Sequence, residues 1–434
     1  MAKIVLSAAG SAGDVHPVLT LAAELRRRGH RPVVATQEEY RSAVEVLGLE
    51  FHPLRPSQEE IEATLGVSTP ELVRLTTQAS TGLEFAVRRI AMPFLRSSYE
   101  DMVKLCEDAS MVITHTSAFA ARLAAEKLGV PWLSIVLAPF AFMSSFDPPL
   151  LLASPTLEKL RKISDMAFDR AVLRVLKLAS APWTETYREM RRELGLPQRP
   201  NPLFEGQFSP LGTLALYSKH YGSVQSDFPP AANITGFCYY DGGGGDQRIN
   251  DELEHFLRKG PPPIVFTIGS ALVHEPRGFF ESGAVAATQN GRRAVLLVGP
   301  YAKAKKLASR DVFVADGYVP HVRLFPRAHA VVHHGGIGTT AQALRAGRPQ
   351  LVVPFSADQP DNALRLVRMG VARSVPITAF TAKKAAAEVE ALDAPNYAER
   401  ARSIREAMAQ EDGPGAASDA IERLIATHAT RRYA

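Results

Sequence analysis

The chain has 434 residues, of which 46% are hydrophobic and 22% are charged, and its formal net charge is +5. This size and composition predict two α/β cores in a cytoplasmic protein. The modest charge, carried by scattered arginines, argues against nucleic-acid binding and leaves peripheral contact with an anionic membrane open. Two cysteines, Cys106 and Cys238, exclude a disulfide scaffold and a thiolate metal site. The longest apolar stretch, Val130 to Met143, is too short to span a bilayer.

The first half of the chain alternates short apolar runs with helical patterns, which is typical of a parallel sheet covered on both faces. We expect strands at Ile4–Leu6, Val33–Ala35, Met111–Ile113, Trp132–Val136 and Thr213–Leu216, the last closing the first domain. We expect helices from near Pro17 to Gly29, from Thr69-Pro70 onward, over Ala118–Gly129 and over most of Pro155–Leu196.

A change of composition separates the two halves. Residues 221–247 are rich in Ser, Pro and Gly and end in Gly242–Gly245, which indicates a linker. The run Ile264–Ala271 then repeats the pattern of Ile4–Ala12, a strand leading into a glycine turn. This echo indicates a second Rossmann-like unit, although chance similarity of short apolar strands would look the same. We therefore predict domains at 1–222 and 249–412, a linker at 223–248, and a C-terminal segment at 413–434.

The strongest motif is His333-His334-Gly335-Gly336-Ile337-Gly338-Thr339-Thr340. It follows the apolar run Ala330–Val332 and leads into a predicted helix, Ala341 to Gly347. A glycine-rich turn at a helix N-terminus presents backbone N–H groups to an anion such as a diphosphate. Asp358-Gln359-Pro360-Asp361-Asn362 follows the next strand-like run, Leu351–Pro354. Polar side chains at the carboxyl end of a buried strand are typical of a ligand crevice.

The run from Tyr318 to Asn362 resembles the nucleotide-sugar signature of family-1 glycosyltransferases, and Gly10–Pro17 fits the same bacterial branch. That branch includes rhamnolipid-type rhamnosyltransferases and sterol or antibiotic glycosyltransferases. The resemblance implies an α/β GT-B fold, in which two Rossmann-like domains face a central cleft. It also implies that the last helix, about Ala416–Ala426, packs back on the first domain.

In the second half, the resemblance makes His334 the histidine that binds the diphosphate, whereas the residue pattern alone allows a core histidine at a strand end. Further donor-binding candidates are Gly269, Ser270, Tyr318, Val319, Gly336, Gly338, Thr339, Gln342, Asp358 and Gln359. Ser270 and Asp358 would serve equally as helix caps, and Tyr318 as packing. Gln342 stands where plant relatives have a glutamate that binds the ribose diol. This difference favours a dTDP-sugar such as dTDP-rhamnose, or a more loosely held UDP-sugar such as UDP-glucose.

In the first half, inverting transfer needs a base that deprotonates the acceptor hydroxyl. Asp14 matches the base of the Gly-Asp branch, and His16 has the more suitable intrinsic pKa. Asp14 is the preferred candidate, with helix N-capping as its structural alternative. Relatives orient a catalytic histidine with a later aspartate. That position is His115 here, so we expect no such dyad and treat His115 as an accessory residue near the acceptor.

Phe140 and Phe142 lie in an apolar segment that we expect to line a pocket for a lipid, sterol, flavonoid or polyketide, unless they only pack in the core. No Asp-x-Asp and no convincing metal spacing occurs in the sequence. We therefore expect a metal-independent hexosyltransferase without a cofactor, with the nucleotide sugar as co-substrate. The alternative is a catalytically silent nucleotide-binding homologue that serves another transferase as partner.

Overall fold

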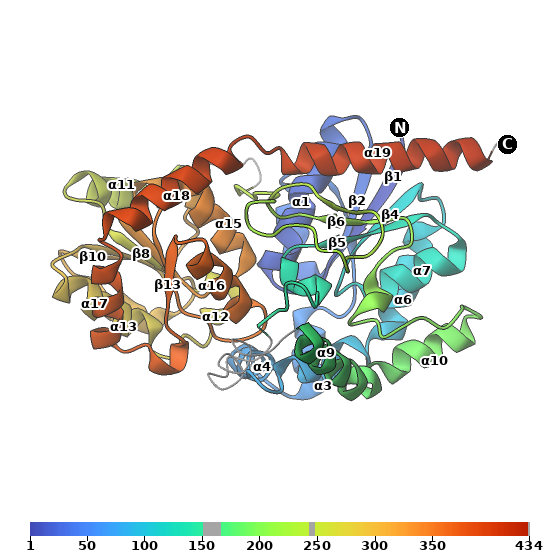
Figure 1. The fold of residues 1–434 in the computed structure, drawn as a ribbon, viewed down its shortest axis with the longest axis horizontal. Coiled ribbons are helices and arrows are strands. Elements are labelled where there is room, and N and C mark those ends of the chain that lie inside the picture. The colour runs from blue at the N-terminus through green and yellow to red at the C-terminus, as the bar shows by residue number, and fades with distance from the viewer. Residues whose placement is uncertain (151–165, 243–247, 433–434) are drawn as a thin grey trace. The chain divides into compact units, whose positions relative to one another are not determined.

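The computed structural model describes residues 1–150, 166–242 and 248–432. The chain forms two compact units. Unit 1 comprises Met1–Ser68, Ser80–Gly243 and Glu411–Ala434, and unit 2 comprises Thr69–Ala79 and Gly244–Gln410. Each unit is a twisted parallel sheet with helices packed against it (Figure 1). Within the described residues, no helix is both long and apolar enough to cross a membrane.

Unit 1 is built on a seven-stranded sheet of order β3-β2-β1-β4-β5-β6-β7. Its strands are β1 (Lys3–Ser7), β2 (Arg31–Thr36), β3 (Glu50–Pro53), β4 (Met111–His115), β5 (Trp132–Val136), β6 (Thr213–Ala215) and β7 (Ala232–Ile234). Its α-helices are α1 (Ala12–Arg27), α2 (Arg41–Glu45), α3 (Gln58–Leu65), α5 (Gly82–Phe85), α6 (Leu95–Cys106), α7 (Phe119–Leu128), α9 (Met166–Ser180), α10 (Glu185–Glu193) and α19 (Gly413–Arg432). Shorter helical turns are η1 (Glu38–Tyr40), η2 (Ala86–Ala91), η3 (Pro139–Phe142), η4 (Ala181–Thr184) and η5 (Glu205–Gln207).

Unit 2 is built on a six-stranded sheet of order β10-β9-β8-β11-β12-β13. Its strands are β8 (Ile264–Thr267), β9 (Ala294–Leu297), β10 (Val312–Ala315), β11 (Ala330–His333), β12 (Gln350–Val352) and β13 (Ala372–Ser374). Its α-helices are α4 (Thr69–Thr76), α11 (Asp251–Arg258), α12 (Gly269–Leu272), α13 (Phe279–Gln289), α14 (His321–Leu324), α15 (Ile337–Ala346), α16 (Gln359–Arg368), α17 (Ala382–Ala391) and α18 (Pro395–Met408). Shorter turns are η6 (Ala302–Leu307), η7 (Phe325–Arg327) and η8 (Ile377–Ala379).

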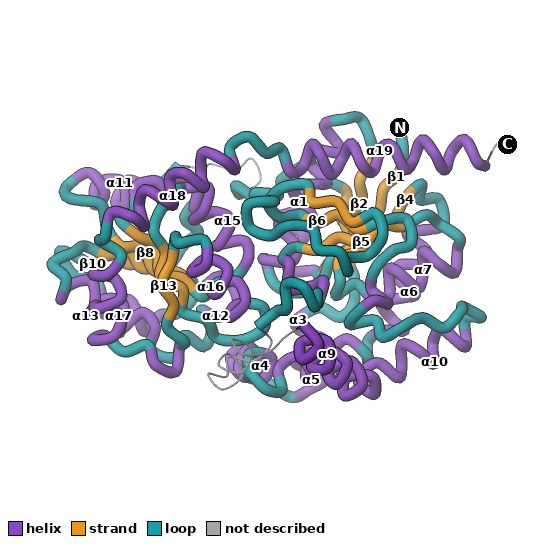
Figure 2. The backbone as a smooth tube through the Cα atoms, in the orientation of Figure 1, coloured by secondary structure: helices purple, strands orange, loops and turns teal. Residues whose placement is uncertain are grey.

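The two sheets share one strand order. Counting strands from the start of each unit, the first six are arranged 3-2-1-4-5-6 in both, which is the Rossmann arrangement. The central strands β4, β5 and β8 are buried along their whole length, because helices cover both faces of a parallel sheet (Figure 2). The similar sequences at Ile4 and Ile264 therefore open two equivalent units.

Several predicted boundaries shift in the structure. Helix α1 begins at Ala12, not near Pro17, and α15 begins at Ile337, not at Ala341. Both glycine-rich turns are thus shorter than expected, because their last residues already form the first helical turn. Strand β7 lies inside the segment expected to be a linker and pairs with β6, so β6 does not close the sheet. Of the region expected to be helical, residues 155–165 lie outside the described part.

Two segments pack away from their neighbours in sequence. Helix α4 belongs to unit 2, where Val73 is buried in the core with residues of the second half of the chain. Helix α19 returns to unit 1 and packs on α1. There Arg28 forms ion pairs with Asp419 at 2.5 Å and Glu422 at 2.8 Å.

Candidate active site

Three turns of unit 2 meet at the carboxyl edge of its sheet. Strand β11 lies between β8 and β12, and His333 is in register with both Thr267 and Val352. Gly269 lies in the turn after β8, His334 in the turn after β11 and Asp358 in the turn after β12. Residues about 90 positions apart are thus gathered at one edge of the sheet, which is where open α/β sheets bind ligands.

His334 is seated between two glycines. A Cβ atom on Gly336 would lie 2.2 Å from its Nε2, and one on Gly269 would lie 2.8 Å from its Cε1. Real Cβ contacts are essentially never so short, so the ring occupies this place only because both residues are glycine. The side chain is buried, and its Nδ1 has no hydrogen-bond partner among the described residues. Such a buried polar atom calls for a ligand or a water molecule.

Burial lowers the pKa of His334 to about 3, with further lowering by the neighbouring His333 and His321. Its imidazole is therefore neutral near pH 7 and carries one N–H donor. His333, in contrast, is held on both sides. Its Nδ1 accepts from the N–H of Gly335 at 3.1 Å, so its Nε2 donates to Oε1 of Gln350 at 2.9 Å. The interpretation as a core histidine thus fits His333 and not His334.

The N-terminus of α15 adds an anion-binding surface. Gly336 is the N-cap, and the first three helical residues, Ile337, Gly338 and Thr339, have no intrahelical acceptor for their N–H groups. The helix macrodipole places positive potential at the same point. Gln342 lies further along α15 and is only 7% exposed. The predicted phosphate residues after β11 therefore lie together at the N-cap and in the first two turns of α15.

Asp358 and Gln359 are tied to this surface through Asn362. Asp358 stands at the N-cap position of α16, but its side chain makes no capping hydrogen bond, so the capping alternative is wrong. Its Oδ2 accepts from Nδ2 of Asn362 at 2.7 Å, and the same Nδ2 donates to the carbonyl of Gly335 at 2.9 Å. Asn362 is fully buried. We assigned it no role from the sequence, although its place one turn after Asp358 was a usable signal.

Gln359 already uses its carbonyl oxygen inside the protein. Its Oε1 accepts from the N–H groups of Phe355 at 2.8 Å and Ser356 at 3.2 Å. The amide nitrogen is thus the part of Gln359 suited to a ligand.

Ser270 lies in the turn after β8 and is exposed. It is not a helix cap, because Ile268 holds that position.

The loop after β10 carries Tyr318 and Val319. Val319 is buried in a core cluster, so its backbone is the part that can meet a ligand. Tyr318 is 68% exposed, so its ring is not part of the hydrophobic core. His321 follows, with its ring stacked on Phe325 at a centroid distance of 4.3 Å. His321 contributes to the lowered pKa of His334, so this loop lies close enough to affect the His334 imidazole electrostatically.

Unit 1 seats Asp14 in a similar way. Asp14 is the third residue of α1, and Ser11 is the N-cap, so Asp14 is not the N-cap itself; its side chain caps the helix as the N3 member of a capping box. Its Oδ2 accepts from the backbone N–H of Ser11 at 2.7 Å and from its hydroxyl at 2.9 Å. Gly10 has a φ of 132°, and a Cβ there would lie 2.5 Å from this oxygen. Glycine at position 10 therefore makes room for the carboxylate.

The other oxygen of Asp14 faces His115. The distance from His115 Nε2 to Asp14 Oδ1 is 3.9 Å, and the His115 side chain is 8% exposed. His115 ends β4, which pairs with β1, and this pairing brings it to the start of α1. Position 115 holds no aspartate, so the dyad of relatives, a histidine oriented by a later aspartate, is not formed. Asp14 and His115 instead approach each other with the two residue types exchanged.

His16 does not join Asp14. Its ring stacks on Tyr240 at a centroid distance of 4.0 Å and an angle of 24°. One turn later, Thr20 donates to the carbonyl of Tyr239 at 3.2 Å. Residues two positions apart on a helix point in different directions, so Asp14 and His16 serve different surroundings. Burial lowers the pKa of His16 to about 4.

The predicted acceptor phenylalanines differ in exposure. Phe142 is 7% exposed and stacks on Phe228 at 3.8 Å and Phe208 at 5.6 Å. This burial assigns Phe142 to packing, which corrects our expectation that it lines an acceptor pocket. Phe140 is half-buried.

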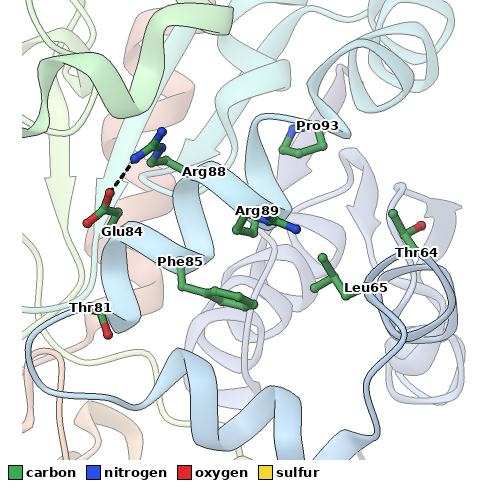
Figure 3. A pocket seen from close by; sticks show the side chains of 8 residues that line it. All are labelled: Thr64, Leu65, Thr81, Glu84, Phe85, Arg88, Arg89 and Pro93. Carbon is green, nitrogen blue, oxygen red and sulfur yellow. Dashed lines mark hydrogen bonds and ion pairs between the residues drawn. The ribbon is translucent and has the colours of Figure 1, made fainter.

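A cavity of about 700 Å³ opens elsewhere in unit 1, and neither phenylalanine lines it (Figure 3). It is lined by Thr64, Leu65, Thr81, Glu84, Phe85, Arg88, Arg89 and Pro93.

Within residues 1–150, 166–242 and 248–432, no three His, Cys, Asp or Glu side chains gather closely enough to hold a metal ion. The two cysteines are free and buried.

Comparison with known proteins agrees with this fold. Residues 4–144 match the glycosyltransferase family 28 N-terminal domain, and residues 306–424 match the erythromycin biosynthesis protein CIII-like C-terminal domain. O-mycaminosyltylonolide 6-deoxyallosyltransferase of Streptomyces fradiae is 33% identical over 99% of both chains. Sterol 3-beta-glucosyltransferase UGT80B1 of Arabidopsis thaliana is 27% identical over 98% of this chain and 68% of its own. The glycosyltransferase SsfS6 of Streptomyces sp. SF2575, complexed with thymidine diphosphate, has a TM-score of 0.64 at 22% identity and covers 98% and 100% of the two chains.

These findings define an enzyme of GT-B fold that uses a nucleotide sugar. The chain belongs to the family-1 glycosyltransferases, together with transferases of antibiotics and sterols.

Proposed function

We propose that the enzyme transfers a sugar from a nucleoside diphosphate donor to a hydroxyl group of a hydrophobic small molecule, with inversion at the anomeric carbon and without a metal ion. The observation that carries this proposal is the seat of His334 at the N-terminus of α15. A diphosphate leaving group develops negative charge as its bond to the sugar breaks. The neutral imidazole N–H and the first backbone N–H groups of α15 stabilise that charge.

Asp14 acts as the base in this proposal. The acceptor oxygen forms a bond to the anomeric carbon, and the electron pair of the sugar–phosphate bond leaves with the diphosphate. The acceptor proton moves to the carboxylate of Asp14. Both hydrogen bonds from Ser11 fall on Oδ2, so they fix the direction of the carboxylate while Oδ1 is turned toward His115. The stacking of His16 on Tyr240 supports Asp14 over His16 as the base.

For the donor, we propose a dTDP-sugar, with UDP-glucose as the weaker substrate. Gln342 offers an amide where a carboxylate would bind a ribose diol more strongly. The thymidine diphosphate held by SsfS6 and the deoxy sugar named for the Streptomyces fradiae relative support the same nucleotide class. Gln359 and the Asp358–Asn362 pair then meet the sugar hydroxyls.

For the acceptor, we propose a hydrophobic hydroxylated natural product or sterol. The names of the two curated relatives support this class. Phe140 remains the aromatic candidate for contact with the acceptor, since Phe142 is occupied by its two phenylalanine neighbours.

Peripheral membrane contact is a separate proposal, carried by α9. The side of this helix that faces away from the protein is partly apolar, with Val175 63% and Leu178 67% exposed. Arg170 and Arg174 on the same helix are also exposed. Apolar side chains flanked by cations suit the interface of an anionic bilayer. Co-sedimentation with phosphatidylglycerol vesicles, lost in Val175→Asp/Leu178→Asp, would support this contact. Equal pelleting of that variant would refute it.

The central test is mass spectrometry of reactions that pair the purified chain with dTDP-rhamnose or UDP-glucose and a panel of hydrophobic alcohols. A product heavier by one deoxyhexose or one hexose establishes transfer and identifies the donor. Equal rates with and without EDTA support metal independence, and the anomeric configuration of the product reports inversion or retention. Saturable nucleotide binding with no product would favour a nucleotide-binding partner of another transferase.

A variant test addresses the proposed role of His334. His334→Ala should lower kcat/KM by about 100-fold, the size of effect seen when a transition-state donor is removed. His255→Ala, at an exposed position of α11 in the same unit, is the control. An unchanged kcat/KM in His334→Ala would remove the role in leaving-group stabilisation.

A further inference from the structure

We propose that His115 is the proton partner of Asp14: it takes up the proton that the carboxylate receives from the acceptor. This inference rests on the proposed function, because it assumes that Asp14 is the base. It goes beyond that function because it makes a buried histidine, previously placed near the acceptor, a positioning and proton-holding residue.

The hydrogen bonds around His115 fix which ring nitrogen carries its hydrogen. The hydroxyl of Ser117 donates to the carbonyl of Ala9 at 2.6 Å. Its only hydrogen is then in use, so its oxygen accepts from Nδ1 of His115 at 2.8 Å. Neutral His115 therefore carries its hydrogen on Nδ1. Its Nε2 therefore carries a lone pair, and Nε2 is the ring nitrogen that faces Asp14.

The resting pair lacks the proton that would join it. Asp14 Oδ1 and His115 Nε2 are 3.9 Å apart, longer than a hydrogen bond, and each presents an electron pair to the other. A proton that arrives on Oδ1 turns this arrangement into an O–H···N hydrogen bond, or into a carboxylate–imidazolium ion pair after transfer to Nε2. The attraction is thus created during the reaction, and an interaction of this kind accelerates the chemical step.

The groups around His115 and Asp14 keep the histidine neutral in the resting enzyme. Burial lowers the pKa of His115, Asp14 raises it and Arg122 of α7 lowers it, so the ring stays neutral until the acceptor proton arrives. Tyr40 approaches the same carboxylate from η1, and its hydroxyl donates to the carbonyl of Gly10 at 3.0 Å. Thr116 Oγ1 lies 3.4 Å from Nε2 and completes the polar groups around the ring. Asp14 is half-buried, so it can return the proton to solvent after product release.

The first test is an NMR titration of the full-length enzyme with ¹⁵N-labelled histidine, which needs no substrate. We expect the Nδ1–H form of His115 in the neutral state. We also expect its pKa to be lower in Asp14→Asn, because the stabilising carboxylate is gone. His220, whose Nε2 is likewise 3.9 Å from a carboxylate, that of Glu411, is the internal control. An Nε2–H form, or the same His115 pKa with and without Asp14, would overturn the proposal.

The second test separates positioning from packing by two amide variants. Gln places its amide nitrogen near the position of Nε2, whereas Asn places it near that of Nδ1. His115→Asn should lower kcat by about 100-fold, within the range of general acid–base effects, with the KM for donor unchanged. His115→Gln should lose as much, because an amide nitrogen near the position of Nε2 is a hydrogen-bond donor and cannot take up the proton. The acidic limb of the kcat/KM profile should also move to lower pH in His115→Asn, because the pair no longer holds a shared proton.

The third test exchanges the two residues. The double variant Asp14→His/His115→Asp should be more active than either single variant, because a working pair is re-formed in the opposite order. Additive losses would overturn the pairing. Failure of the pair is distinguishable from failure of the proposed function. Full transfer by Asp14→Asn would show that Asp14 is not the base, which contradicts the proposed function. The NMR result tests the pair alone, because it needs no acceptor.

Discussion

In unit 1 the candidate reactive group is a carboxylate with room made for it by Gly10, and in unit 2 it is an imidazole seated by Gly269 and Gly336. Both groups follow the carboxyl end of a central strand in the same sheet order. Their electrical surroundings differ. Asp14 faces a buried histidine that can accept a proton, whereas His334 has two histidines near it, and both lower its pKa. Glycines after a central strand thus make room for a carboxylate next to a histidine in unit 1 and for a neutral imidazole next to two histidines in unit 2.

The largest expected effect comes from filling the seat of His334. Gly336→Ala places a Cβ 2.2 Å from Nε2 and must displace the ring. A shift of about 1 Å at a reacting group costs on the order of 100-fold in rate, so we expect kcat/KM for the donor to fall by about that factor. Gly317→Ala in the same unit is the comparison, since a Cβ there meets nothing within 4 Å. Similar losses in both variants would show that the seat is not what positions His334.

The equivalent change in unit 1 is Gly10→Ala. Here the Cβ would lie 2.5 Å from Asp14 Oδ2, at a φ of 132° that alanine rarely adopts. We expect the displaced carboxylate to lower kcat by roughly 30-fold, which is about 2 kcal/mol of activation free energy. The backbone strain should separately lower the free energy of unfolding by about 1–3 kcal/mol. Isothermal titration with dTDP should give an unchanged Kd, because the donor seat is in unit 2. Weaker dTDP binding would contradict the assignment of donor binding to unit 2 alone.

A smaller effect is expected in the pH dependence of stability. Unfolded His334 titrates near the ordinary histidine pKa of about 6.5. The folded pKa is about 3, so the unfolded state binds one more proton between these values. The free energy of unfolding therefore falls as the pH is lowered through this window, by about 1.4 kcal/mol per pH unit for this residue. His334→Gln should show a slope shallower by that amount in urea titrations between pH 6 and 4.5. An identical slope would show that the ring is not buried as a neutral group.

The smallest expected effect is a change of donor preference in Gln342→Glu. A carboxylate at this position of α15 should favour a ribose diol, raising the ratio of UDP-sugar to dTDP-sugar use by about threefold, or about 0.7 kcal/mol. Competition between the two donors in one reaction measures the ratio directly. No change would leave the choice of nucleotide to residues outside α15.

The sequence was a good guide to strands and a poorer guide to where helices begin. Strand Trp132–Val136 has the expected bounds, because a buried apolar run has few alternatives. Helices α1 and α15 both begin earlier than expected, since their first turns are rich in glycine and small polar residues with weak helical signals. Strand β7 was missed because only three residues of a proline- and glycine-rich segment pair with β6.

The candidate site shows the same limit at the level of side chains. The motifs pointed to His334, which follows a strand and precedes two glycines, and to Asp14, which follows a strand and a glycine. The sequence placed His115 near the acceptor, but its nearness to Asp14 was not visible, because it depends on the pairing of β1 with β4, more than 100 residues later. Hydrogen bonding separated His333 from His334, and burial removed Phe142 from the acceptor list; neither outcome can be read from residue type.

The membership of α4 in unit 2 bears on the engineering of hybrid enzymes. A chimera that took only residues 248–410 from a relative would bring a foreign core to the original α4, whose Val73 is buried in that core. It would also separate Arg277 from its hydrogen-bond partner Thr77. An exchange of sugar specificity between relatives should therefore transplant residues 69–79 together with the second half. Helix α19 should stay with the recipient, because it belongs to unit 1.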